Sequence, residues 1–176
     1  MRTTKISNNS KEHFKEELKM ENVYLARVDD RLIHGQVMTA WMKTYPAKQI
    51  VIIDDEVVKD SFMINVLTMA APAGVKVRVF GVEKAATLLK KGVKNPTILL
   101  AKTPITYWRL IDSGVDLPAV NLGGMGINGE RKTLYKNLAA SDAEREAIQN
   151  MISKGVDVKI QVIPADKIVD VAELLK

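Results

Sequence analysis

The sequence contains no cysteine and few aromatic residues. Of its 176 residues, three are Phe, two Trp and four Tyr. The absence of cysteine excludes disulfides, thiolate catalysis and zinc sites built on cysteine. So few aromatic side chains argue against the stacking platforms that bind single-stranded nucleic acid. We therefore expect no nucleic-acid partner.

Long apolar runs are also missing. No stretch approaches the roughly 20 residues that a bilayer-spanning helix needs, and the start of the chain lacks the apolar core of a secretory signal. Hydrophobic residues make up 47% and charged residues 27% of the chain, which is ordinary for a globular protein. These features predict a cytoplasmic protein whose main body is one domain.

Metal-ligand patterns are absent as well. The chain has two histidines, and neither lies in a His/Asp/Glu cluster with metal-ligand spacing. We expect neither a metal nor another cofactor. His13 is assigned no role.

The charge balance is mildly basic, with a formal net charge of +5. Residues 1–19 carry five Lys or Arg and three Glu, which gives +2 there and leaves +3 for the remainder. This scattered charge lacks the clustered basic face typical of nucleic-acid binding. It suits an anionic group or an acidic protein partner.

Residues 1–19 are polar and have no wide apolar stripe. We interpret them as a flexible N-terminal extension, and residues 20–176 as the single domain. A further hypothesis is that translation begins at Met20, since the first core strand follows almost at once. Detection of a native peptide spanning Ser10 to Lys19 by mass spectrometry would contradict it.

Strand and helix patterns alternate along the rest of the chain. Apolar or alternating runs predict strands at 23–28, 49–53, 75–80, 97–101, 118–122 and 157–162, with a short edge strand at 131–137. Capping residues and helical spacing predict helices at 35–44, 61–70, 82–91, 104–113 and 142–153, and a last helix after Pro164 and Ala165. This order indicates a three-layer α/β/α fold whose mainly parallel sheet has six or seven strands and allows an antiparallel edge strand.

The stretch from Arg27 to Val37, RVDDRLIHGQV, contains the strongest functional candidate. Its histidine, His34, lies where a strand ends and a helix begins, and ligands bind at such junctions in open α/β sheets. Imidazole has an ordinary pKa of about 6.5, so a neutral ring nitrogen is available for attack on phosphorus at cytosolic pH. We therefore predict that His34 carries a phosphoryl group.

Neighbouring residues suit that chemistry. The backbone N–H groups of Gly35, Gln36 and Val37 would be free phosphate donors at a helix N-terminus. Arg31 offers a guanidinium for the phosphoryl oxygens. Either Asp29 or Asp30 would orient Arg31 or accept from the other ring nitrogen of the histidine. The alternative is that His34 merely caps the helix while Arg31 pairs with one of these aspartates on the surface.

Three further features have open interpretations. Gly123, Gly124 and Met125 follow a strand and either form a tight turn, the favoured interpretation, or approach the histidine loop; their spacing does not fit a dinucleotide fingerprint. Of Asp54 and Asp55, one would line the site and the other cap a helix, or both would be solvated loop charges. Trp41 and Trp108 are expected to pack in the core or an interface.

The stretch RVDDRLIHGQV resembles the active-site signature of IIB components of the bacterial sugar phosphotransferase system, in the mannose/fructose/sorbose family. The resemblance continues through Ile52 to Asp55, Asn121 to Met125 and Val162 to Pro164. It implies that His34 is phosphorylated on Nδ1 by the IIA component, with Arg31 as the loop arginine. It also implies onward transfer to a sugar that enters through the membrane IIC and IID components, with which the protein would associate peripherally.

The family resemblance leaves the sugar open among mannose, fructose, sorbose and amino sugars. The fold alone would also allow a non-enzymatic module that binds a nucleotide or phospho-ligand. A third interpretation is a regulatory protein whose histidine state signals sugar supply. For the donor complex, we expect a weak, transient interface with Arg27, Arg31, Met38 and Lys43 around its rim.

Overall fold

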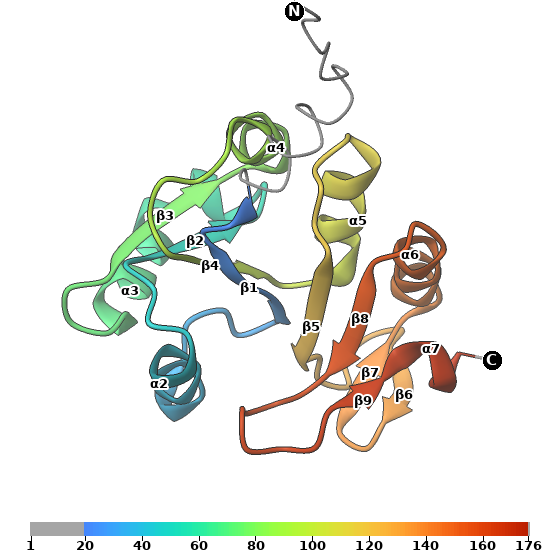
Figure 1. Ribbon diagram of the computed structural model, residues 1–176. Helices are drawn as coiled ribbons and strands as arrows, with labels where there is room; N and C mark the ends of the chain where they lie inside the picture. The colour runs from blue at the N-terminus through green and yellow to red at the C-terminus, as the bar shows by residue number, and fades with distance from the viewer. Residues whose placement is uncertain (1–19, 176) are drawn as a thin grey trace, which may run out of the picture.

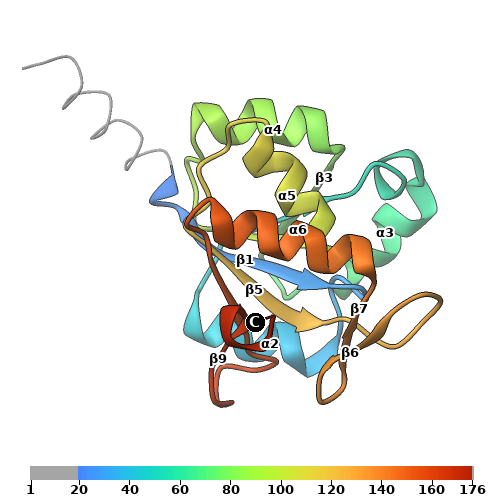
Figure 2. The same cartoon turned by 90° about the vertical axis from the view of Figure 1, so that its right-hand side faces the viewer.

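A computed structural model describes residues 20–175, apart from the side chain of Gln36. The extension predicted at residues 1–19 lies outside the described residues. Within the described range, one seven-stranded sheet is flanked by helices on both faces (Figures 1 and 2). The predicted three-layer α/β/α class is therefore confirmed. None of the described helices combines the length and apolar character needed to cross a bilayer.

The strands of the large sheet are ordered β3-β2-β4-β1-β5-β8-β9, and the last one is antiparallel to β8. Their bounds are β1 Val23–Asp29, β2 Gln49–Ile53, β3 Lys76–Phe80, β4 Thr97–Ala101, β5 Ala119–Gly124, β8 Asp157–Ile160 and β9 Val169–Asp170. A separate antiparallel pair consists of β6 Lys132–Tyr135 and β7 Leu138–Ala140. The helices are α2 Gly35–Thr44, α3 Ser61–Ala70, α4 Val82–Lys91, α5 Pro104–Asp112, α6 Asp142–Ser153 and α7 Val171–Leu174, with a 3-10 turn η1 at Val57–Lys59.

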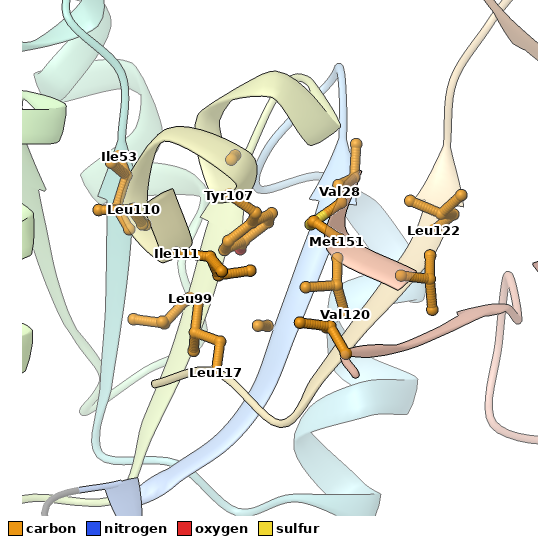
Figure 3. Close-up of a cluster of buried hydrophobic side chains, with 14 of the residues drawn as sticks. Val28, Ile53, Leu99, Tyr107, Leu110, Ile111, Leu117, Val120, Leu122 and Met151 are labelled. Carbon is orange, nitrogen blue, oxygen red and sulfur yellow. The ribbon is translucent and has the colours of Figure 1, made fainter. Parts of the chain in front are cut away.

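Two hydrophobic clusters lie on opposite faces of the sheet. Side chains alternate along a strand, so Leu99 of β4 belongs to the cluster under α4, α5 and α6, whereas Leu100 belongs to the cluster under α2 and α3. Figure 3 shows the first cluster, in which the Tyr107 ring of α5 lies among aliphatic side chains from neighbouring strands. Burial on both faces explains the continuous apolar runs of β2 and β4.

The order in which strands are added to the sheet changes direction at β1: β2 and β3 lie on one side of it, and β5 and β8 lie on the other. Strand β1 lies between β4 and β5 and is parallel to both. The helix that follows β1 packs on one face, and the helix that follows β4 packs on the other (Figure 2). Adjacent strands whose helices leave to opposite faces open a crevice at their carboxyl ends, which is the topological switch point of an open α/β sheet.

Two predictions for the C-terminal third are wrong in detail. The strand expected at 131–137 lies in the separate β6–β7 pair, so the antiparallel edge of the large sheet is β9 instead. The helix expected directly after Pro164 is confined to α7, because residues 161–166 form a turn. There the side-chain amide of Gln161 donates to the carbonyls of Pro164 and Asp166 at 3.0 Å each.

Candidate active site

His34 lies in the loop that joins β1 to α2, at the switch point of the sheet. The loop turns sharply. Leu32 has a φ of 58°, Gly35 has a φ of 39°, and the amide of Leu32 donates to the carbonyl of Asp29 at 2.9 Å. A left-handed backbone is strained for leucine, and such strain persists only where the surroundings hold it. Leu32 is buried at 3% exposure, so packing of its side chain helps to keep the backbone in this conformation.

The His34 ring contacts the end of its own strand. Its Nε2 lies 2.9 Å from Oδ2 of Asp29, and 21% of the side chain is exposed. His34 occupies the N-cap position of α2, but its side chain makes no capping hydrogen bond. The interpretation of this side chain as a helix cap is therefore wrong. Because an ionised carboxylate only accepts, Nε2 bears the hydrogen in this contact, and the Nδ1 lone pair remains available.

A buried arginine holds Asp29 from the other side. Nη2 of Arg27 donates to Oδ2 of Asp29 at 3.1 Å, and Nη1 donates to Oδ1 of Asn121 at 2.7 Å and to the carbonyl of Gln161 at 3.0 Å. The guanidinium lies 5.4 Å from the centre of the Trp41 ring. Burial lowers the pKa of Arg27, and the charge of Asp29 opposes that shift. The His34 ring thus contacts the Asp29 carboxylate, which is itself held by the buried Arg27 guanidinium.

The glycine segment makes room for this pair. Gly123 and Gly124 end β5 rather than forming a turn, so the favoured turn interpretation is wrong. A Cβ on Gly123 would collide with the Arg27 guanidinium, and one on Gly124 would lie 2.5 Å from Oδ1 of Asp29. A side chain at either position would therefore displace the groups that hold His34. Met125 is buried at 1% exposure, so its side chain belongs to the core rather than to the loop surface.

Asp30 fixes the start of the loop. Its amide donates to the carbonyl of Gly124 at 2.8 Å, and its Oδ2 accepts from the amide of Gly126 at 2.9 Å and from Nη1 of Arg131 at 3.0 Å. Asp29 and Asp30 thus have separate tasks: the first contacts the histidine, and the second attaches the loop to β5 and to the segment that follows it.

Arg31 is the exposed cation of the loop. Its side chain is 60% exposed, its Nε lies 3.7 Å from Oδ1 of Asp29, and its amide donates to the same oxygen at 3.1 Å. The backbone amides of Gly35, Gln36 and Val37 form the first turn of α2, where N–H groups have no acceptor within the helix. An exposed guanidinium and a helix N-terminus beside one histidine suit a dianionic phosphoryl group.

Other predicted residues have different roles. Oδ1 of Asp54 accepts from the amides of Glu56 and Val57 at 2.9 and 2.8 Å, whereas Asp55 accepts from the first amide of α4 and from Arg109, both at 2.8 Å. Both aspartates therefore cap backbone segments and pair with cations, and none of these contacts is with His34. Trp41 is buried at 2% exposure and Trp108 packs against the larger cluster, as expected.

The predicted rim needs correction at two positions. Arg27 is 0% and Met38 2% exposed, so neither side chain can contact a partner, whereas Arg31 and Lys43 are exposed. Sequence reasoning also missed Arg131 and Glu144 as neighbours of the loop. A signal for Arg27 was present in the strand pattern: an arginine in a central parallel strand, on the same face as Leu25, requires a buried counter-ion.

No three His, Asp or Glu side chains within residues 20–175 gather closely enough to ligate a metal.

The fold and the loop together define a mainly parallel α/β domain in which a histidine held by a carboxylate lies at the switch point of the sheet. Residues 23–176 match the family model of the sorbose-subfamily IIB component of the phosphotransferase system, and the chain belongs to this family. Its general role is phosphotransfer in sugar uptake.

Relatives with different sugars in their names are similar over most of the domain. The fructose-specific EIIB component of Bacillus subtilis is 31% identical, over 89% of this chain and 98% of its own length. The mannose-specific EIIAB component of Escherichia coli K12 is 31% identical over 86% of this chain, which spans 47% of that longer protein. The crystal structure of manxB from Thermoanaerobacter tengcongensis is 40% identical, with a TM-score of 0.79 over 87% of this chain and 94% of that one.

Proposed function

We propose that the protein is a phosphocarrier that accepts a phosphoryl group on Nδ1 of His34 from a phosphorylated IIA component. It then passes the group to a sugar that enters through membrane IIC and IID components. The contact between Nε2 of His34 and Asp29 at 2.9 Å carries this proposal, because it leaves Nδ1 as the nucleophile. The fusion implied by the name of the mannose-specific EIIAB relative supports a IIA partner.

This transfer requires no added base, because Nδ1 of His34 carries no proton before the attack. The Nδ1 lone pair attacks phosphorus, the donor N–P bond breaks, and its electron pair returns to the donor nitrogen. The product ring carries phosphorus on Nδ1 and hydrogen on Nε2, so the ring is cationic, and the Asp29 carboxylate stabilises that charge. The exposed guanidinium of Arg31 and the first amides of α2 neutralise the phosphoryl oxygens during the in-line displacement.

Transfer onward reverses the roles. A sugar hydroxyl attacks phosphorus, the N–P bond of His34 breaks, and the hydroxyl proton leaves to solvent or to a base of the sugar-bound component. A cationic ring is the better leaving group, so the same Asp29 contact serves both halves of the reaction. In this proposal the protein works in the cytoplasm and meets the permease only peripherally.

The direct test uses a phosphorylated IIA domain as radiolabelled donor. Wild-type protein is expected to take up about one acid-labile phosphoryl group per chain, and His34→Ala none. His13→Ala is the matched control, since His13 is the only other histidine, and it should label as wild type does. Stoichiometric labelling of His34→Ala would overturn the assignment. Reversible binding of a phosphorylated ligand without covalent labelling would favour the non-enzymatic module.

A further inference from the structure

Arg131 connects the loop that carries His34 (residues 30–34) to Gly126, just after β5, and to Glu144 in the first turn of α6. Its side chain is 9% exposed. The guanidinium donates from Nη1 to Oδ2 of Asp30 at 3.0 Å and to the carbonyl of Gly126 at 3.2 Å, and from Nε and Nη2 to the two oxygens of Glu144 at 2.9 and 2.7 Å. Bidentate pairing fixes the plane of the guanidinium, and therefore the direction in which Nη1 points.

Glu144 is a rigid anchor for this arginine. It is the N3 residue of a capping box, so its Oε2 also accepts from the amide of Ser141 at 3.0 Å. Its Oε1 accepts from the hydroxyl of Thr103 at 2.9 Å, and Thr103 caps α5 directly after β4. Burial alone would lower the pKa of Arg131, but Glu144 and then Asp30 outweigh it and leave that pKa raised.

The anchored arginine acts on the loop at one point, Asp30. Strand β1 is flanked by β4 and β5. Through Glu144, which lies in the first turn of α6 and contacts Thr103 at the start of α5, Arg131 connects Asp30 to the starts of both helices. Asp30 also bonds to Gly124 and Gly126, at and just after the end of β5. The segment held in this way continues into Leu32 with its φ of 58°. A strained loop requires such external support to keep one conformation.

We propose that Arg131 is a positioning residue for phosphoryl transfer: through Asp30 it fixes the loop that presents His34. This inference rests on the proposed function for its catalytic consequence and on the Arg131–Asp30 contact for its structural one. Among the described residues, the guanidinium of Arg131 bonds to Asp30, Gly126 and Glu144 and not to His34. Its effect therefore concerns loop geometry, and it should be felt with any phosphoryl donor.

The test uses phosphoramidate, a small chemical phosphoryl donor, so that no protein partner is needed. Arg131→Gln and Asp30→Asn are each expected to slow labelling of His34 by about tenfold, since small displacements of a reacting group cost one to two orders of magnitude in rate. The double variant should be no slower than either single one, and Arg131→Lys should recover part of the rate. Equal rates for wild type, Asp30→Asn and Arg131→Gln would overturn the proposal.

Arg145→Gln is the matched control. Nη2 of Arg145 donates to the carbonyl of Thr133 at 2.8 Å, so this arginine ties the same hairpin to α6 without contacting Asp30. Asp30→Asn keeps the Arg131–Glu144 pair intact, which separates positioning from loss of folding. A slowing of Arg145→Gln as large as that of Asp30→Asn would assign the effect to the hairpin in general and contradict a specific role for Arg131.

A second measurement is independent of phosphorylation. In nitrogen-15 NMR of the His34 ring, Asp30→Asn and Arg131→Gln are expected to speed exchange of the Nε2 proton severalfold, and Arg145→Gln to leave it unchanged. If wild-type protein accepted no phosphoryl group but these exchange rates differed as expected, the proposed function would fail while the positioning role of Arg131 stood. Unchanged exchange in both variants would reject the positioning role.

Discussion

The Asp29 carboxylate contacts both the His34 ring and the Arg27 guanidinium, and it has a different role toward each. Its side chain is 1% exposed, and Oδ2 lies 2.9 Å from the histidine ring and 3.1 Å from the buried Arg27 guanidinium. A buried cation without a counter-ion is strongly destabilising, so we expect Asp29 to stabilise the fold as well as to serve the proposed phosphoryl transfer. Gly123 and Gly124 leave the space in which this pair lies.

At this scale, we predict that Asp29→Asn impairs both roles, each with its own measurement. Asparagine has nearly the same shape but no charge, and its amide can donate to Nε2 and move the ring hydrogen to Nδ1. Labelling of His34 should fall at least about 100-fold, and the free energy of unfolding by about 3 kcal/mol. Ring nitrogen-15 shifts should show a larger fraction with hydrogen on Nδ1.

Asp54→Asn is the control for Asp29→Asn. Asp54 follows the carboxyl end of β2, and among residues 20–175 its carboxylate contacts backbone amides and Lys102. It should label at the wild-type rate. A labelling rate for Asp29→Asn within twofold of wild type would show that the ring is oriented by something other than this carboxylate.

At the scale of the elements, the sequence was most informative where a local rule decides the structure. The helices predicted at 104–113 and 142–153 begin where such rules act: Thr103 caps α5, with Pro104 in its first turn, and the capping box of Ser141 and Glu144 starts α6. Such contacts span three or four residues, so the sequence order displays them. The motif around His34 was likewise found because its residues are adjacent in the chain.

Contacts between distant segments were not predictable in this way. Arg27 and Asn121 are 94 positions apart, and Arg131 and Asp30 are 101 apart. The spacing of residues along the chain does not show that Gly123 lies against the Arg27 guanidinium from β1. A turn was therefore the natural interpretation of the glycines. The two-residue strand β9 was also missed, since it exists only through its pairing with β8.

The element-scale prediction concerns Glu144 at the start of α6. Burial alone would raise its pKa, but hydrogen bonds from Arg131, Ser141 and Thr103 leave the pKa lowered. A lowered folded-state pKa stabilises the fold above the unfolded carboxyl value of about 4.3, and this stability is lost as pH falls through the folded-state value. Glu144→Gln should therefore be less stable at pH 7, by about 3 kcal/mol.

Urea unfolding between pH 7 and pH 3 checks the Glu144 prediction. The gap between wild type and Glu144→Gln should begin to narrow as pH falls below about 4.3, where the unfolded chain takes up a proton. It should stop narrowing only once pH has fallen through the lower folded-state pKa, where Glu144 is neutral in both states. Glu146→Gln on the exposed side of the same helix is the control and should follow the wild-type curve. A gap that stayed constant over this range would mean that the ionised carboxylate contributes no net stability.

At the scale of the whole molecule, the sheet separates two clusters that share one set of strands. Leu99 and Leu100 are neighbours on β4, both fully buried, yet they face opposite clusters. The loop that carries His34 follows β1, and α2 packs on one face of the sheet while α5 packs on the other (Figure 2). The position of His34 therefore depends on both clusters remaining packed on the same sheet.

This arrangement predicts that the domain unfolds as one unit whichever cluster is weakened. Leu99→Ala and Leu100→Ala should each lower the free energy of unfolding by about 2–5 kcal/mol. Both faces should still unfold at the same urea concentration, because the strands of one sheet cannot lose one packed face and keep the other. The two tryptophans report on the two faces: Trp41 lies on α2, and Trp108 on α5 packs against the larger cluster.

Single-tryptophan versions, made with Trp41→Phe or Trp108→Phe, would follow each face separately by fluorescence. Coincident transitions in both versions of both leucine variants are the expected result. If Leu100→Ala let the Trp41 signal change at lower urea than the Trp108 signal, the α2 face would open on its own. In that case α2, which begins directly after His34, would unfold locally. The rate of phosphoryl uptake should then fall in the same urea range in which the Trp41 signal changes.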